Sequence, residues 1–239
     1  MKNITIALIG NPNVGKTVIF NNLTGARQHV ANWPGVTVEK KTGNYIYKGV
    51  KVNVVDLPGI YSLTSNSIDE KIARNFIIEE KPDVVVDIID GTILERNLYL
   101  TLLLLELGAN VVVALNMYDE VQQKGIQIDI RKLEKLLGIP VIPTIATKKF
   151  GMNKVKDKIL EIAENKVHIK KELIEFSPRI ETLILNIMKI LKECPELSKS
   201  YLPRWVAIKI LENDEEILEK IPNDIMKKIN KVIKNATRN

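Results

Sequence analysis

The chain has 239 residues, of which 45% are hydrophobic, so it is long enough to bury a sizeable core and to form more than one domain. Lysine and arginine exceed aspartate and glutamate by 35 to 29, a mild basic excess that a solvated lysine-rich face explains without a nucleic-acid partner. The single cysteine, Cys194, excludes an internal disulfide, and the longest apolar run is about half as long as a membrane-spanning helix.

Apolar, β-branched runs alternate with helical patterns through the first two-thirds of the chain. Several of these runs are apolar on both faces, which is typical of strands in a helix-covered parallel sheet. Two runs flank Lys48 and Gly49 and predict an antiparallel hairpin at the sheet edge. The predicted strands are 4–9, 36–47, 50–55, 84–89, 111–115 and 141–145, and the predicted helices are 15–23, 67–80, 92–107, 129–137 and 153–163. This order predicts a doubly wound, mostly parallel α/β fold with ligands at the carboxyl ends of the strands.

The composition changes after Ala163, where a polar segment begins and strand patterns end. Ser177 and Pro178 predict the N-cap and first turn of a helix over 180–191. Prolines 195, 203 and 222 separate further helices, predicted at 205–211, 215–219 and 224–233. We therefore expect an α/β domain over 1–165 and an all-α domain over 166–239, with Trp205 in the core of the second.

Residues 10–17, GNPNVGKT, match the phosphate-loop pattern G-x-x-x-x-G-K-[ST] directly after the first predicted strand. Glycines let backbone N–H groups turn inward around a phosphate, and the following helix points its positive end at the same anion. Lys16 is expected to reach the β- and γ-phosphates, and the Thr17 hydroxyl to ligate Mg²⁺. The predicted nucleotide-binding loop comprises Gly10, Asn11, Pro12, Asn13, Val14, Gly15, Lys16, Thr17 and Val18. A chance glycine turn is the weaker alternative, because the strand and helix context is also correct.

Two further segments are predicted to face the phosphates and the metal. Asp56 follows a strand and can hold the magnesium hydration shell, while the N–H of Gly59 can contact a γ-phosphate. The loop Gly35, Val36 and Thr37 lies between the first helix and the hairpin, and the Thr37 hydroxyl is expected to close over Mg²⁺ as a switch. Each signal is weak alone, since such residues are common in ordinary turns.

The end of the strand 111–115 carries the signature of a purine site. The Asp119 carboxylate can accept both N1–H and N2–H of guanine, whereas adenine would leave that charge unpaired. Asn116 is expected to brace the loops around the base, and Met117 to pack on it with a flexible thioether. Ala146, Thr147 and Lys148 complete the predicted pocket, with the Ala146 N–H facing the guanine carbonyl oxygen. An ordinary loop is the alternative interpretation.

Four motifs together resemble the N-terminal G domain of the ferrous-iron transporter B (FeoB) family of GTPases: GNPNVGKT at 10–17, NWPGVTVE at 32–39, DLPGIYSL at 56–63 and NMYD at 116–119. The resemblance covers about 1–163, and the tail is similar in position and class to the family's helical spacer domain, described as inhibiting nucleotide release. It implies a regulatory domain that binds and slowly hydrolyses GTP on the cytoplasmic side of the cell membrane. Its implied partner is the chain's own membrane-spanning, Fe²⁺-carrying domain, and a homo-oligomer is left open.

The sequence departs from the general GTPase pattern at Ile60, where a glutamine often orients the attacking water. The resemblance implies a replacement, namely a K⁺ ion bound in part by the Asn13 side chain. We therefore expect Asn13, Lys16, Thr37 and Gly59 to serve hydrolysis of GTP to GDP. Trp33, in the loop before Thr37, is expected to rest on the first helix or on a partner.

Other functions and ligands remain open at this point. A ribosome-assembly or tRNA-modification GTPase would use the +6 charge to bind RNA, but the basic residues are dispersed among glutamates. A nucleotide sensor that does not hydrolyse GTP is favoured only by Ile60. The isolated His29 and His168 do not indicate a metal site, and we expect no Fe²⁺ bound to this chain.

Overall fold

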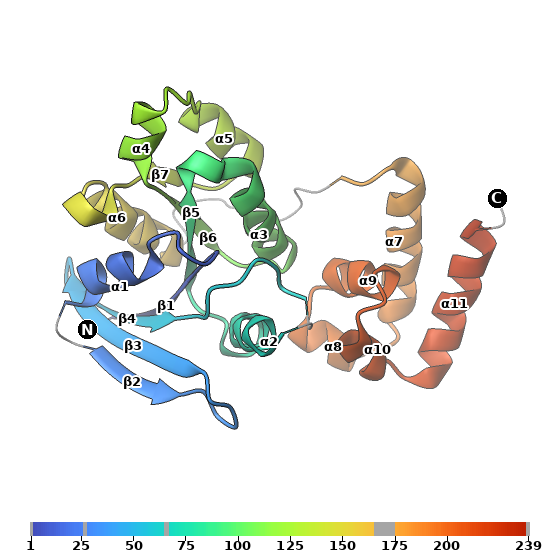
Figure 1. Cartoon of the computed structure of the whole chain (residues 1–239). Helices are drawn as coiled ribbons and strands as arrows, with labels where there is room; N and C mark the ends of the chain where they lie inside the picture. Colours follow the sequence, from blue (N-terminus) through green and yellow to red (C-terminus); the bar gives the residue numbers. More distant parts are fainter. Residues whose placement is uncertain (1, 26–27, 65–66, 165–174, 238–239) are drawn as a thin grey trace. The chain divides into compact units, whose positions relative to one another are not determined.

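The computed structural model describes residues 2–25, 28–64, 67–164 and 175–237, which form two compact units (Figure 1). The first is built mainly from the residues up to 164, and the second mainly from 175–237. The boundary predicted between 165 and 166, and His168, lie outside the described residues. Each unit is therefore considered by itself.

The first unit is built on a seven-stranded sheet in the order β2-β3-β4-β1-β5-β6-β7. The strands are β1 (Asn3–Gly10), β2 (Gln28–Asn32), β3 (Glu39–Tyr47), β4 (Val50–Asp56), β5 (Val84–Asp90), β6 (Val111–Asn116) and β7 (Val141–Pro143). Strands β4, β1, β5, β6 and β7 pair in parallel, while β3 pairs antiparallel with both β4 and β2. The predicted mostly parallel α/β sheet is confirmed.

The edge of the sheet differs from the prediction. The β3–β4 hairpin is antiparallel as expected, but β2 pairs with β3 and takes the edge position. Strand β2 was missed because four of its five side chains are exposed, so it has no alternation of apolar and polar residues. Strand β3 also begins at Glu39, later than predicted, because 33–38 form the turn that joins it to β2.

Helices cover both faces of the sheet (Figure 1). Their bounds are α1 (Lys16–Thr24), α2 (Ile68–Asn75), a π-helix η1 (Phe76–Glu80), a 3₁₀-helix η2 (Gly91–Ile93), α3 (Leu94–Glu106), α4 (Tyr118–Gln123), α5 (Ile130–Leu137), a 3₁₀-helix η3 (Ala146–Lys148) and α6 (Met152–Ala163). Residues of α1 and α6, such as Phe20 and Ile159, pack with alternate residues of the central strands in one core. The single helix predicted over 67–80 is divided between α2 and η1. Helix α4 was not predicted.

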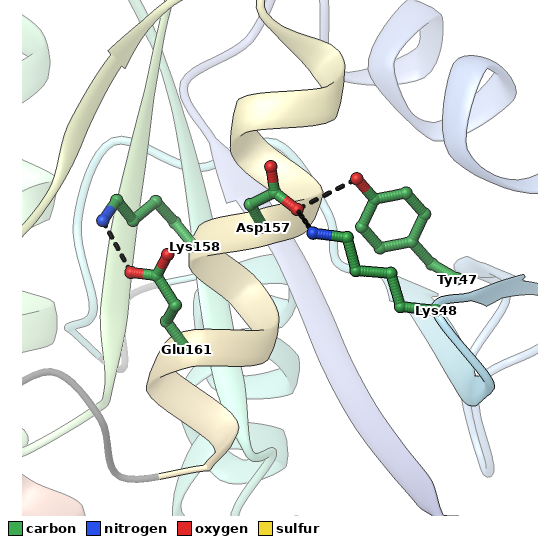
Figure 2. Close-up of polar contacts among 5 residues, drawn as sticks. All are labelled: Tyr47, Lys48, Asp157, Lys158 and Glu161. Carbon is green, nitrogen blue, oxygen red and sulfur yellow. Dashed lines mark hydrogen bonds and ion pairs between the residues drawn. The ribbon is translucent and has the colours of Figure 1, made fainter.

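The turn of the β3–β4 hairpin is fastened to α6 (Figure 2). Asp157 Oδ1 accepts hydrogen bonds from Tyr47 Oη, at 2.9 Å, and from Lys48 Nζ, at 2.7 Å. Lys48 itself has a positive φ of 48°, so the turn presents its ammonium group toward the helix. The next residue of α6, Lys158, pairs with Glu161 of the same helix at 2.6 Å. The two hydrogen bonds to Asp157 hold together elements that are about 110 residues apart in the chain.

A carboxyl group lies in the interior between β5 and α3. Asp87 is fully buried, and its Oδ2 accepts a 2.6 Å hydrogen bond from Thr101 Oγ1. Its Oδ1 has no hydrogen-bond partner among the described residues. Burial raises the pKa of Asp87 to about 7, although the bond from Thr101 opposes this shift.

We expect Asp87 to make the folded protein less stable as the pH rises. Between about pH 4 and pH 7 the folded state keeps a proton on Asp87 that the unfolded state has lost, so stability falls with rising pH across this window. Relative to Asp87→Asn, the wild type should lose on the order of 2 kcal/mol of unfolding free energy between pH 5 and pH 8. Urea denaturation at both pH values measures this, and parallel pH profiles of the two proteins would contradict it.

The second unit contains helices only in its described part. They are α7 (Pro178–Leu191), α8 (Pro195–Ser200), α9 (Pro203–Leu211), α10 (Glu215–Glu219) and α11 (Asn223–Thr237). Trp205 is buried and stacks on Tyr201 with ring centroids 5.5 Å apart, so its predicted core position is confirmed. Arg204 binds both carboxylate oxygens of Glu181, at 2.7 and 2.8 Å, which links α9 to α7 and lowers the Glu181 pKa to about 2. Helix α8 was missed because Pro195 begins it rather than separating helices.

Candidate phosphate and base site

The segment between β1 and α1 has the backbone of a phosphate loop. Gly15 has a φ of +88°, and a Cβ there would lie 2.4 Å from Asn116 Nδ2. A Cβ on Gly10 would lie 2.3 Å from the carbonyl oxygen of Ile88. Only glycine fits at these two positions, which explains the first and second fixed glycines of the motif.

Polar groups line this loop. Asn11 is buried, and its Oδ1 has no hydrogen-bond partner among the described residues. Asn13 is exposed and has a φ of 69°, a left-handed conformation that asparagine tolerates. Helix α1 begins at Lys16, and among the described residues no side chain caps its first turn. Such a helix start favours an anion through its N–H groups and its dipole.

Lys16 and Asp56 are adjacent at the carboxyl ends of β1 and β4. Lys16 Nζ lies 2.5 Å from Asp56 Oδ1, and the side chains are only 14% and 8% exposed. Lys41 is the residue opposite Asp56 on β3. Burial raises the pKa of Asp56, an effect that the charges of Lys16 and Lys41 partly offset. The structure thus brings together the cation predicted for phosphate and the carboxylate predicted for Mg²⁺.

The segment that follows Asp56 lies against the phosphate loop. The N–H of Ile60 donates to the carbonyl oxygen of Gly10 at 3.2 Å. A Cβ on Gly59 would lie 3.4 Å from the Cα of Pro12, an ordinary van der Waals distance, so Gly59 lies directly against the phosphate loop. The Ile60 side chain is buried, and it offers no polar atom to a water molecule.

The base-pocket loops are joined to each other and to the phosphate loop through Asn116. Its Nδ2 donates to the Val14 carbonyl oxygen at 2.8 Å, as expected of a bracing residue. Its Oδ1 accepts from the Ala146 N–H at 3.0 Å and from Thr144 Oγ1 at 3.4 Å. The Ala146 N–H is thus bonded to Asn116 in this structure, and its predicted contact with a guanine oxygen stays a prediction.

Asp119 lies at the start of α4 and pairs with Lys148 from η3. Lys148 Nζ is 3.0 Å from Asp119 Oδ2, and this hydrogen bond lowers the pKa of Asp119. Met117, with a φ of 57°, occupies the N-cap position of α4 and is half-buried. Thr147 is exposed. The four residues lie on neighbouring loops at the carboxyl ends of β6 and β7, as the sequence predicts.

The predicted switch loop does not lie at the start of α1, where the phosphates are expected. Gly35, Val36 and Thr37 form the turn between β2 and β3, and Figure 1 shows this turn well away from α1. Thr37 is exposed and is not brought together with Thr17 and Asp56. The expected magnesium contact of Thr37 therefore requires this turn to move.

Trp33, in the same turn, does not rest on the first helix as one alternative predicted. It is buried against Phe76 of η1, with ring centroids 5.7 Å apart and the rings nearly perpendicular. Lys40 Nζ lies 4.5 Å from the centre of the Trp33 ring. Side chains of these types attract each other by edge-to-face and cation–π contacts.

Sequence reasoning missed three residues that support the site. Thr144 and Asn22 contact the base-pocket loops, since Asn22 Nδ2 donates to the Ala146 carbonyl oxygen at 2.7 Å. Lys41 contributes positive charge beside Asp56. The polar residues Asn22 and Thr144 had no motif to identify them. Lys41 could have been found by pairing the two predicted hairpin strands in register.

The donor set fits magnesium better than iron. Mg²⁺ is commonly held by one or two carboxylates together with substrate phosphates, and this chain offers the Asp56 carboxylate and the Thr17 hydroxyl as candidate ligands. Among the described residues, no three His, Cys, Asp or Glu side chains gather where they could hold a metal ion. Within that part of the chain, no helix is long and apolar enough to cross a membrane.

Comparisons with known proteins agree on one family. The family model for ferrous iron transport protein B matches residues 4–159, and that for the FeoB cytosolic helical domain matches 176–239. The Fe(2+) transporter FeoB of Methanocaldococcus jannaschii is 51% identical over 93% of this chain, which covers 33% of the transporter. This chain thus spans about a third of that relative's length.

Solved structures show the same fold over nearly the whole chain. A mutant of S. thermophilus NFeoB bound to GDP is 37% identical with a TM-score of 0.89, and the match covers 98% of this chain and 89% of that one. The cytosolic domain of T. maritima FeoB in a GDP form is 36% identical with a TM-score of 0.86, over 99% and 98% of the two chains.

Proposed function

This chain belongs to the ferrous iron transport protein B family, and we propose that it is the guanine-nucleotide-binding, GTP-hydrolysing part of a ferrous-iron transporter. The observation that carries the proposal is the connection of a phosphate loop to a base pocket through Asn116, which bonds to Val14 on one side and Ala146 on the other. The GDP in two structures of the same fold supports it.

The phosphates of GTP are expected to lie at the start of α1. The uncapped helix N-terminus and the backbone around Gly10 and Gly15 favour an anion there. Lys16 then exchanges its carboxylate partner, Asp56, for the β- and γ-phosphates. This exchange releases Asp56 toward the metal side of the site.

Thr17 and Asp56 are the residues that would hold Mg²⁺, joined by Thr37 when its turn moves toward the phosphates. When bound, Mg²⁺ would supply positive charge that offsets the negative charge developing during phosphoryl transfer. Burial disfavours the ionised form of Asp56, so a cation beside it would relieve that cost.

Hydrolysis must proceed without a glutamine after Gly59. Ile60 is buried, and its backbone N–H is bonded to Gly10, so neither group is placed to orient water. The neighbouring N–H of Gly59 remains the proposed γ-phosphate contact. Asn13 is an exposed residue of the phosphate loop and is proposed to help bind K⁺, which would supply positive charge at the phosphates. We expect intrinsic hydrolysis to be slow.

The transport role is proposed from the relatives, which are named as Fe²⁺ transporters and are about three times as long as this chain. In this proposal the chain lies on the cytoplasmic side of the membrane and regulates a membrane-spanning domain of the same protein. The family match does not favour the alternative of a ribosome-assembly or tRNA-modification GTPase.

Competition titration tests the nucleotide assignment. Fluorescent GDP bound to the purified chain with Mg²⁺ should be displaced by unlabelled GDP and GTP at much lower concentrations than by ADP and ATP. Equal displacement by guanine and adenine nucleotides would refute the base-pocket assignment.

We expect Thr17 to be a constant magnesium ligand and Thr37 a conditional one. Thr17 lies on the fixed start of α1, whereas Thr37 lies on an exposed turn. Thr17→Ala should weaken Mg-GDP and Mg-GTP binding on the order of ten-fold, while Thr37→Ala should spare GDP. Titrations of both nucleotides with both variants measure this, and equal losses of GDP affinity would remove the distinction.

A further inference from the structure

Asp119 has a cationic partner of its own. Lys148 Nζ contacts Asp119 Oδ2 at 3.0 Å, and the two side chains come from different loops of the base pocket. The Lys148 side chain is 65% exposed and that of Asp119 is 26% exposed, so the pair lies at the mouth of the pocket. Backbone N–H groups of Asp119 and Glu120 also favour the ionised carboxylate.

This partner changes how strongly the pocket can reject a wrong base. A pocket carboxylate selects guanine because adenine leaves the carboxylate without hydrogen-bond donors. A Lys148 side chain that keeps this pair with either base bound would leave the Asp119 carboxylate partnered in both complexes. The ammonium group also neutralises Asp119, which weakens the charge-assisted hydrogen bonds that guanine can make.

We propose that Lys148 lowers the guanine selectivity of this site by pairing with the residue that recognises the base. The inference rests on the proposed function, in which Asp119 accepts N1–H and N2–H of guanine. In this proposal Lys148 influences base choice through Asp119, and in that role it is a positioning residue.

The test is the ratio of the GDP and ADP affinities in Lys148→Met, which removes the charge and keeps most of the side-chain stem. We expect the ratio to rise about two- to five-fold over wild type, the range that an exposed ion pair produces. Lys148→Arg keeps the cation and should keep the wild-type ratio. Lys149→Met removes a charge from the next position, which is exposed, and serves as the control.

The salt dependence of the ratio of GDP and ADP affinities is a second measurement. A purely structural role of Lys148 would leave this dependence unchanged. Raising NaCl from about 0.1 to about 1 M shortens the Debye length from about 10 to about 3 Å and screens exposed pairs. The ratio should therefore rise with salt in the wild type and stay constant in Lys148→Met, since GDP and ADP share the same phosphates.

Two different results would overturn the inference, and they separate a failure of the Lys148 proposal from a failure of the proposed function. An unchanged ratio in Lys148→Met, including an equal loss of both affinities, would show that Lys148 does not influence base choice, while leaving guanine recognition intact. A wild type with no preference for GDP over ADP would overturn the proposed function itself.

Discussion

Asp119→Asn should reduce the affinity for GDP and GTP by about a hundred-fold or more and raise the affinity for xanthine nucleotides. The amide replaces one acceptor with a donor, which opposes a guanine N–H but suits the carbonyl that xanthine carries there. The substitution also removes the carboxylate partner of Lys148. Competition titrations with GDP and XDP measure both changes.

Glu120→Gln is the matched control for this change. Glu120 follows Asp119 on α4, is exposed and pairs with Lys124 at 3.8 Å. Glu120→Gln therefore removes one negative charge, as Asp119→Asn does, but at a position that faces solvent. It should bind GDP as the wild type does. A GDP affinity in Asp119→Asn equal to that of the control would mean that Asp119 does not read the base.

K⁺ should accelerate GTP turnover ten- to a hundred-fold over Na⁺, and removal of the Asn13 side chain should abolish this difference. The acceleration corresponds to about 1.4 to 3 kcal/mol, which one well-placed charge can supply. The sequence places no arginine in the phosphate loop or beside Thr37, and Ile60 is apolar. Asn13 is an exposed residue of the phosphate loop, and we expect its side-chain carbonyl to contact the ion. Rates in KCl and in NaCl measure the effect.

The backbone at Asn13 decides which substitutions are informative. Its φ of 69° is strained for alanine but natural for glycine, so Asn13→Gly removes the side chain without the strain that Asn13→Ala adds. Both variants should lose the K⁺ effect and keep GDP affinity, since backbone N–H groups and Lys16 hold the phosphates. Asn13→Asp keeps an oxygen and should retain part of the effect. Matching wild-type rates in the two salts would leave Asn13 a structural residue.

The sequence predicted best those parts of the fold that are buried on both faces. Strands β5 and β6 are mostly apolar and, apart from Asp90 at the end of β5, buried, because helices cover both of their faces, and their positions agree with the prediction within one residue. Strand β2 is exposed and polar, so its position depends on pairing with β3 rather than on its own pattern.

The motifs likewise located the site but not its internal contacts. Spacing alone identified Asn116, Asp119 and Lys148, because fixed distances from a strand end place them at one edge of the sheet. The hydrogen bond between Asn116 and Ala146, and the ion pair of Asp119 with Lys148, join residues about 30 positions apart. Such contacts depend on how the two loops approach, which no local pattern encodes. The packing of Trp33 on Phe76 was missed for the same reason.

The most direct test of the account is release of inorganic phosphate by the purified chain, measured over many turnovers with GTP and with ATP in KCl and Mg²⁺. We predict slow, continuous release from GTP and none above background from ATP, because Asp119 selects the base and the phosphate loop holds the reacting groups. Equal release from both nucleotides, or no release from GTP that the chain demonstrably binds, would contradict the proposal that this chain is a GTPase.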